Sequence, residues 1–223
     1  MKIQIEPALF HASGEKLCLA SISGDVTWRD SQPDLWRLVQ EEVRQVQGRY
    51  AIEDVAKLPQ IAGLRETYKN LGKKPQKYRG SNESLLRRIL KESGLYQVSN
   101  LVDINNLVSL RSLRSVGSYD RERLQPPVSF SVGQAGEPYE GIGRGPLNIA
   151  NMPVFRDQQG PFGSATSDSE RTKVAARTSR LVMVIIGFDG GDGLSDQAEF
   201  ASELLAKFAS GRDLEVAIHQ YSQ

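Results

Sequence analysis

Cysteine is almost absent from this chain, and histidine is nearly as scarce. Cys18 is the single cysteine among 223 residues, so neither an intramolecular disulfide nor a metal cluster built from several cysteines can form. The two histidines, His11 and His219, lie near opposite ends of the sequence, and neither has metal-ligand spacing with Cys18. These absences argue against a cysteine–histidine hydrolase, and we expect no metal and no cofactor.

Long apolar runs are missing as well. The longest, LVMVII at residues 181–186, has the length of one strand, whereas a membrane-spanning helix needs about 20 apolar residues. The N-terminus shows no charged-then-apolar signal pattern. With 39% hydrophobic and 25% charged residues, the chain has the composition of an ordinary globular protein. We therefore expect a soluble cytoplasmic protein that has no membrane partner.

Acidic residues are nearly absent from one segment, residues 69–91. Eight basic residues and a single acid, Glu83, give this segment a formal charge of +7, although the whole chain carries only +1. The basic residues are Lys69, Lys73, Lys74, Lys77, Arg79, Arg87, Arg88 and Lys91. Two interpretations remain open: a surface that contacts phosphates, or a helix face and a loop that are merely solvated.

Hydrophobic periodicity and turn residues predict a mixture of helices and short strands. Four helices are expected over about 33–47, 60–71, 82–93 and 100–112, and a fifth after Ser195. The expected N-caps are Ser31, Ser81 and Ser195. Strands are expected in a hairpin over 1–28 and at VSFSVG (128–133), MPVFRD (152–157), RLVMVIIGF (180–188) and DLEVAIHQY (213–221). Because regular β–α–β alternation is missing, the sequence predicts an α+β fold.

Two glycine-rich stretches match known motifs only in part. GIGRGPLN (141–148) lacks the GxGxxG spacing and precedes no clear helix, so dinucleotide binding is not supported. GFDGGDG (187–193) lacks the twelve-residue pattern of a calcium loop, which ends in Glu. A turn from a strand to a helix explains this second stretch better.

One polar segment, SATSDSERTKV (164–174), has two interpretations. It is either a solvated loop or part of a binding site. If the segment is part of a binding site, Asp168 or Glu170 would bind an amino group of the ligand, and Arg171 would bind a phosphate or carboxylate through two hydrogen bonds. Composition alone does not decide between them.

Two adjacent amides, Asn105 and Asn106, interrupt the apolar helix SNLVDINNLVSL (99–110). Helix interiors usually exclude Asn because its side chain competes with the backbone for hydrogen bonds. At helical spacing, apolar residues fall on most sides of this helix, so we expect it to be largely covered. An unpaired buried amide costs about 1–3 kcal/mol. The two amides must therefore bond either to neighbouring backbone or to a ligand.

Three segments, YRGSNESLLRRIL, LYQVSNLVDINNLVSL and VGSYD, resemble the B3/B4 domain of the phenylalanyl-tRNA synthetase β subunit. They resemble still more the free-standing bacterial proteins built from that domain. The resemblance covers about residues 65–212 and rests on the NxVDxxN helix and the aromatic–Asp pair that follows it. It implies an α+β domain of B3/B4 type at 65–223, with a sandwich-like β core flanked by helices. Residues 1–64 would form a small N-terminal extension, a hairpin and a helix packed on that domain.

The resemblance also implies a site. In the synthetase, this domain hydrolyses tRNA wrongly charged with tyrosine, and the amino acid lies in a cleft bordered by the NxVDxxN helix. Carried over without gaps, the family's Thr-Asn pair falls on Asn105 and Asn106, which makes them the candidate catalytic residues. Gly117 stands where the synthetases have a histidine. Lys173, close to Glu170, stands where they have the glutamate that recognises the tyrosine hydroxyl.

The function implied is a tRNA-binding protein that hydrolyses mischarged aminoacyl-tRNA in trans. An aminoacyl ester needs a positioned water and a stabilised oxyanion, which preorganised amide donors can supply without a histidine. The expected substrate-binding residues are Gly117, Asp168, Glu170 and Arg171. The expected tRNA contacts are Lys73, Lys74, Lys77 and Arg79. The alternative is a non-catalytic module that binds tRNA or an amino acid, which Gly117 in place of the histidine favours.

Overall fold

The computed structural model of the chain describes residues 1–91 and 93–222. Its helices are α1 (Pro7–Ala12), α2 (Pro33–Arg49), α3 (Pro59–Asn70), α4 (Ser81–Leu90), α5 (Asn100–Ser112) and α6 (Leu194–Phe208), with short 3-10 helices η1 (Val55–Lys57) and η2 (Arg121–Arg123). Its strands are β1 (Ile3–Ile5), β2 (Cys18–Asp25), β3 (Ser115–Asp120), β4 (Val128–Val132), β5 (Glu140–Gly141), β6 (Gly145–Pro146), β7 (Pro153–Asp157), β8 (Gly160–Ser164), β9 (Arg180–Gly187) and β10 (Arg212–Gln220). The predicted α+β fold is confirmed.

The strands form two four-stranded sheets and one small hairpin. The first sheet has the order β1-β4-β7-β8, in which β1 is parallel to β4 and the other pairs are antiparallel. The second sheet has the order β10-β2-β9-β3 and is antiparallel throughout. Strands β5 and β6 pair with each other. The two large sheets face each other across an apolar core, which makes the sandwich expected from the sequence.

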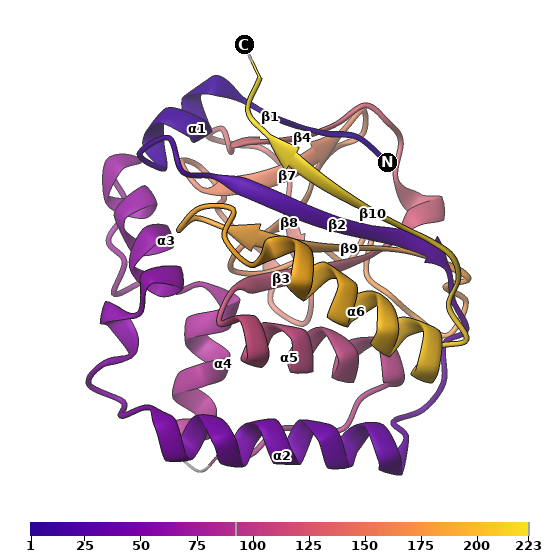
Figure 1. Cartoon of the computed structure of the whole chain (residues 1–223). Coiled ribbons are helices and arrows are strands. Elements are labelled where there is room, and N and C mark those ends of the chain that lie inside the picture. Colours follow the sequence, from indigo (N-terminus) through magenta and orange to yellow (C-terminus); the bar gives the residue numbers. More distant parts are fainter. Residues whose placement is uncertain (92, 223) are drawn as a thin grey trace.

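Helices cover the other face of the second sheet. Helices α5 and α6 pack on it, and α2 packs on α5 from outside (Figure 1). Strand β9 therefore lies between two cores. Residues 182, 184 and 186 belong to the core between the sheets, and residues 181, 183 and 185 belong to the core under the helices. Because both of its faces are buried, this strand needs apolar residues at nearly every position.

The predicted hairpin over residues 1–28 is wrong. Strand β1 pairs with β4 in the first sheet, whereas β2 lies between β10 and β9 in the second sheet. Helix α1 replaces the second half of the expected first strand, because Pro7 begins a helix there. The N-terminal strands are thus built into both sheets. The division of the chain at 64/65 stays a prediction.

The five predicted helices are present, but their ends differ from the expected ones. Gln32, Gly80 and Gly193 occupy the N-cap positions in place of the expected serines, and Ser81 is the first residue of α4. Helix α4 ends at Leu90, and Glu92, which the sequence placed in this helix, lies outside the described residues.

The four strands predicted outside the N-terminal hairpin are all present, and four others were not foreseen. These are β3, β5, β6 and β8, all of which contain glycine, a residue with low strand propensity. Buried neighbours such as Tyr119 and Phe162 compensate for the glycines. No described helix is both long enough and apolar enough to cross a membrane.

Candidate functional site

Helix α5 is covered on most sides, as its sequence predicts, and the two amides lie on the strip that stays open. The helix packs against α2, α4, α6 and β3, and nine of its thirteen residues are buried. Of the other four, Val102, Asn105 and Asn106 are half-buried and Arg111 is exposed. The Ser99 hydroxyl caps the helix by accepting a hydrogen bond from the backbone N–H of Val102 at 3.4 Å. The amides are therefore not buried helix defects.

Asn105 and Asn106 line a cleft of about 350 Å³, which we call the asparagine cleft. Its other lining residues are Ser81, Ser84, Leu85 and Arg88 from α4, Ser109 from α5, and Arg144 and Thr166 from two loops. All of these side chains except Leu85 are polar, and two are arginines. Among the residues that the structure describes, no carboxylate, histidine or cysteine lines the cleft. The cleft therefore suits a polar ligand that carries negative charge.

The amide of Asn105 is held from one side by the sheet. Its Oδ1 accepts a hydrogen bond from the Ser118 hydroxyl on β3 at 2.8 Å. This bond uses the oxygen and leaves the amide N–H groups as the atoms that can meet a ligand. Among the described residues, the amide of Asn106 has no protein partner. The helix thus presents amide donors to the cleft on a rigid support, as stabilisation of an oxyanion requires.

Arg144 gives the cleft a positive charge from a separate element. It lies in the turn between β5 and β6, where its backbone N–H donates to the Gly141 carbonyl at 3.0 Å. The turn depends on Gly143 and Gly145, which adopt positive φ angles of 65° and 69°. In the described part of the chain, no carboxylate lies within ion-pair distance of the Arg144 guanidinium, and the residue is exposed. Its charge is available to a ligand.

The single acid of the basic segment has a structural role. The Glu83 side chain is only 1% exposed and accepts hydrogen bonds from Arg65 at 3.0 Å and Arg87 at 2.8 Å, while Arg79 lies 3.9 Å away. These contacts tie α3, α4 and the preceding loop together. They also hold Arg79, a predicted tRNA contact, next to a carboxylate.

The three predicted lysine contacts lie in the loop before α4. Lys74 and Lys77 are exposed, and the Lys73 ammonium lies 4.7 Å from the centroid of the Tyr78 ring. None of the three pairs with a carboxylate among the described residues. The loop leads directly into Ser81 and Ser84, which line the asparagine cleft. The lysines thus adjoin the cleft along the chain.

Gly117 makes room for a tyrosine. A Cβ atom at Gly117 would lie 2.2 Å from the Tyr119 hydroxyl oxygen, and one at Gly163 would lie 2.3 Å from it. In this space the buried Tyr119 hydroxyl donates a hydrogen bond to Asp168 at 2.9 Å. Asp168 also accepts from the Ser164 backbone N–H at 3.3 Å. Gly117, which the sequence resemblance aligns with a histidine of the synthetases, thus makes the space that the buried Tyr119 occupies.

Burial controls the protonation of this pair. It raises the pKa of Asp168 to about 7, against the opposing effect of the hydrogen bonds from Tyr119 and Ser164. Burial also holds the pKa of Tyr119 well above its usual value. Near neutral pH, the Asp168 carboxyl therefore exchanges between its neutral and ionised forms.

Glu170 and Arg171 have partners inside the protein. Glu170 forms an ion pair with Lys173 and accepts from the Gly143 N–H at 3.1 Å, and these bonds lower its pKa. Arg171 donates to both carboxylate oxygens of Asp157, at 2.9 and 3.1 Å. This bidentate pair braces the turn between β7 and β8.

The structure brings only part of the predicted site together. Asn105 and Asn106 line the cleft, whereas Gly117, Asp168, Glu170 and Arg171 are not among its lining residues. Their roles in substrate binding stay predictions. Sequence reasoning missed Arg88 and Arg144 as cleft residues. Both stood in stretches that had been singled out, Arg88 in the basic segment and Arg144 in GIGRGPLN.

The fold is an α+β sandwich, and the asparagine cleft opens beside helix α5. The family model of the B3/4 domain matches residues 63–219. Because this match covers well over half of the chain, the protein belongs to the B3/4 domain family, and the resemblance inferred from the sequence is confirmed.

Two further comparisons concern individual proteins. No curated protein matches this chain. Among solved structures, it is similar to an N-terminal fragment of the phenylalanyl-tRNA synthetase β subunit from Pyrococcus horikoshii, with 10% sequence identity and a TM-score of 0.46. The match covers 96% of this chain and 50% of that fragment, so the protein spans about half the length of that structure.

Proposed function

We propose that this protein is a cytoplasmic aminoacyl-tRNA deacylase that binds mischarged tRNA and hydrolyses its ester bond in the asparagine cleft. The observation that carries the proposal is the pair Asn105 and Asn106 on the open strip of α5, beside an uncompensated arginine. Membership of the B3/4 family supports it, since the resemblance to the synthetase domain implies editing at this helix.

The chemistry needs few protein groups. A water oxygen attacks the ester carbonyl carbon, and the resulting oxyanion accepts hydrogen bonds from the amide N–H groups of Asn105 and Asn106. The bond between the carbonyl carbon and the ribose oxygen then breaks. The neighbouring hydroxyl of the terminal ribose relays the proton of the water to the leaving oxygen. One well-placed donor is worth about 3–4 kcal/mol of transition-state stabilisation.

Positive charge around the cleft would hold the rest of the tRNA. Arg88 and Arg144 would contact the terminal phosphates, and Lys73, Lys74 and Lys77 would attract the backbone further away. This assignment moves the phosphate contact from Arg171, which is bonded to Asp157, to Arg144.

A second candidate function is a non-catalytic module that binds aminoacylated tRNA. The observation in its favour is that, in the described part of the chain, no acid or base lines the cleft. Among the predicted substrate-binding residues, Asp168, Glu170 and Arg171 all have protein partners. In this case the cleft would recognise the acyl end without hydrolysing it.

A panel of mischarged tRNAs separates the two functions. We expect at least one of them to be deacylated faster than in buffer, and we expect Asn105→Ala to lower that rate by about 10²–10³-fold. Gln40→Ala, which removes an exposed amide from α2, is the matched control and should leave the rate unchanged. If the protein binds tRNA but deacylates none of the panel, the hydrolase function is wrong and the binding module stands.

The basic loop is tested by its salt dependence. Reversing Lys73, Lys74 and Lys77 to Glu should weaken tRNA binding and flatten the dependence of affinity on salt. Reversal of three dispersed lysines, Lys16, Lys57 and Lys207, changes the net charge equally and serves as the control. Equal effects of both triple variants would mean that the loop makes no specific contact.

A further inference from the structure

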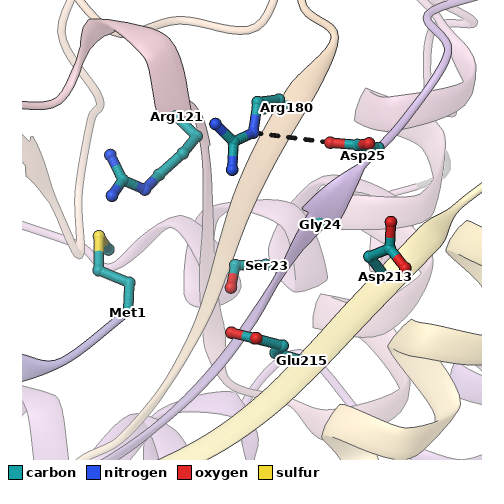
Figure 2. Close-up of a pocket in the computed structure, with 8 residues that line it drawn as sticks. All are labelled: Met1, Ser23, Gly24, Asp25, Arg121, Arg180, Asp213 and Glu215. Atoms are coloured by element: carbon teal, nitrogen blue, oxygen red, sulfur yellow. Dashed lines mark ion pairs between the residues drawn. The ribbon is translucent and has the colours of Figure 1, made fainter.

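A second cavity lies at one end of the second sheet and shares no lining residue with the asparagine cleft. It has a volume of about 520 Å³ and is lined by Met1, Ser23, Gly24, Asp25, Arg121, Arg180, Asp213 and Glu215 (Figure 2). We call it the strand-end cavity. Its volume lies within the range of about 300–1,000 Å³ that is usual for small-molecule sites.

Three paired strands make the floor of this cavity. Asp25 pairs with Arg180, and Ser23 pairs with both Val182 and Glu215. Residues directly opposite in a sheet point to the same face, and residues two apart on a strand do so as well. Arg180 is therefore on the face that buries Val182 between the two sheets, but Arg180 itself is exposed. The first sheet no longer covers this end of β2, β9 and β10.

The charges around the cavity do not neutralise one another. Arg180 lies 3.6 Å from Asp25, which is a long ion pair. For Arg121, Asp213 and Glu215, no group of opposite charge lies within 4.0 Å among the described residues. Figure 2 shows the guanidinium groups of Arg121 and Arg180 in one part of the cavity, with Asp213 and Glu215 elsewhere around it. Apart from the pair of Arg180 and Asp25, the charges that line this cavity form no ion pair with one another among the described residues.

The backbone fixes the acidic side of the cavity. The register of β10 against β2 shifts between Arg212 and Glu215, and within this bulge Asp213 has a φ of 50°, in the left-handed region. Gly24 permits the bulge, because a Cβ atom there would lie 2.7 Å from the Arg212 carbonyl oxygen. Residues held in this backbone region tend to occur at functional sites. The bulge sets Asp213 beside Glu215 at the rim of the cavity.

We propose that the strand-end cavity binds a short peptide in its zwitterionic form. The peptide carboxylate lies between Arg121 and Arg180, and its terminal ammonium lies at Asp213 and Glu215. Guanidinium groups match the planar geometry of a carboxylate, and Ser23, between the two sides, can bond to the peptide group. The three carboxylates disfavour a polyanion such as nucleic acid, and the two arginines disfavour a polycation.

The test is a titration of the intact protein with glycylglycine, followed by the NMR signals of backbone amides. Two capped forms, N-acetylglycylglycine and glycylglycinamide, carry only the negative or only the positive charge. With glycylglycine, we expect saturable shifts of the amide signals of Ser23, Gly24 and Glu215. Each capped form should bind at least about tenfold more weakly, because the loss of one hydrogen bond to a charged group lowers the affinity by about this factor.

Variants on the two sides of the cavity locate the site. The pair Arg121→Ala and Arg180→Ala should weaken glycylglycine binding by about tenfold or more, and so should the pair Asp213→Asn and Glu215→Gln. Arg37→Ala, on the exposed face of α2, is the control. The proposal is overturned if no saturable shift occurs, if the capped forms bind equally well, or if neither double variant weakens binding.

Discussion

The asparagine cleft and the strand-end cavity differ in the sign of their charge and in what supports them. The cleft is formed by two helices and two loops and contains two amides, and its described lining residues carry only positive charge. The cavity is formed by strand ends and carries both signs. Because charge arrangement decides ligand class more than pocket size does, the first suits a phosphate-bearing ligand and the second a zwitterion.

The support behind the two sites also differs. Asn105 is bonded to Ser118 on β3, and the same strand carries Gly117 and the buried Tyr119. The charged side chains of the cavity are mostly exposed and rest on a completed sheet. Substitutions behind the cleft should therefore affect folding, whereas substitutions in the cavity should affect binding alone.

The largest effect on stability is expected at Gly117. Gly117→Ala places a methyl group 2.2 Å from the Tyr119 hydroxyl, and we expect the free energy of unfolding to fall by about 1–3 kcal/mol, as overpacking usually costs. Urea denaturation measures it. Gly48→Ala is the control, because a Cβ there meets no atom within 4 Å and Ala favours the helix by up to about 1 kcal/mol. A stable Gly117→Ala variant would show that Tyr119 is not confined as described.

A smaller effect concerns pH. Burial raises the pKa of Asp168 to about 7, whereas an aspartate in an unfolded chain has a pKa of about 3.9. Between these values, the folded carboxyl keeps its proton while the unfolded one is ionised. Raising the pH therefore favours unfolding, and Asp168 should lower the free energy of unfolding by about 1 kcal/mol per pH unit across this window.

Asp168→Asn tests this contribution. The amide oxygen can still accept the hydrogen bond from Tyr119, but the group no longer titrates. Urea denaturation between about pH 4 and 7 should show a flatter dependence for this variant than for the original protein. Asp30→Asn, at an exposed aspartate, should leave the dependence unchanged. Parallel curves for Asp168→Asn and the original protein would mean that Asp168 is ionised throughout.

The sequence predicted correctly those features that depend on residues close together in the chain. The spacing of apolar residues in α5 showed that the helix is covered, so Asn105 and Asn106 had to be explained by a partner. The unbroken apolar run of β9 marked a buried strand. The three serine N-caps were predicted wrongly, since Gln32, Gly80 and Gly193 occupy those N-cap positions. Propensity at a single position is a weak guide.

Partners distant in sequence could not be predicted in the same way. Strand β1 pairs with residues near 130, and β2 pairs with residues near 185 and 217, so no pattern within residues 1–28 distinguishes these pairings from a hairpin. Arg171 looked available for a phosphate because its partner, Asp157, lies 14 residues earlier, at the end of strand β7. The strand-end cavity gathers residues from the whole length of the chain, and the pairing of β2 with β9 and β10 brings most of them together.

The smallest expected effect compares the two sites directly. Arg144→Glu should lower tRNA affinity several-fold and reduce the slope of affinity against salt by about one, because one phosphate contact is lost. Arg121→Glu makes the same charge change at the strand-end cavity and should leave tRNA binding nearly unaltered. Fluorescence anisotropy at several salt concentrations measures both variants, and glycylglycine binding, measured alongside, should fall only for Arg121→Glu.

The outcomes of this pair decide whether the two sites are separate. Equal losses of tRNA affinity would mean that tRNA reaches both sites, or that it responds only to net charge, and the contrast between them would fail. No loss for Arg144→Glu would remove tRNA from the asparagine cleft, since the exposed guanidinium there has no carboxylate partner among the described residues to mask its effect. The expected result is that Arg144→Glu weakens only tRNA binding and Arg121→Glu weakens only glycylglycine binding. This result would follow from the charges that line each site, because a phosphate backbone needs positive charge alone, whereas a zwitterion needs both signs.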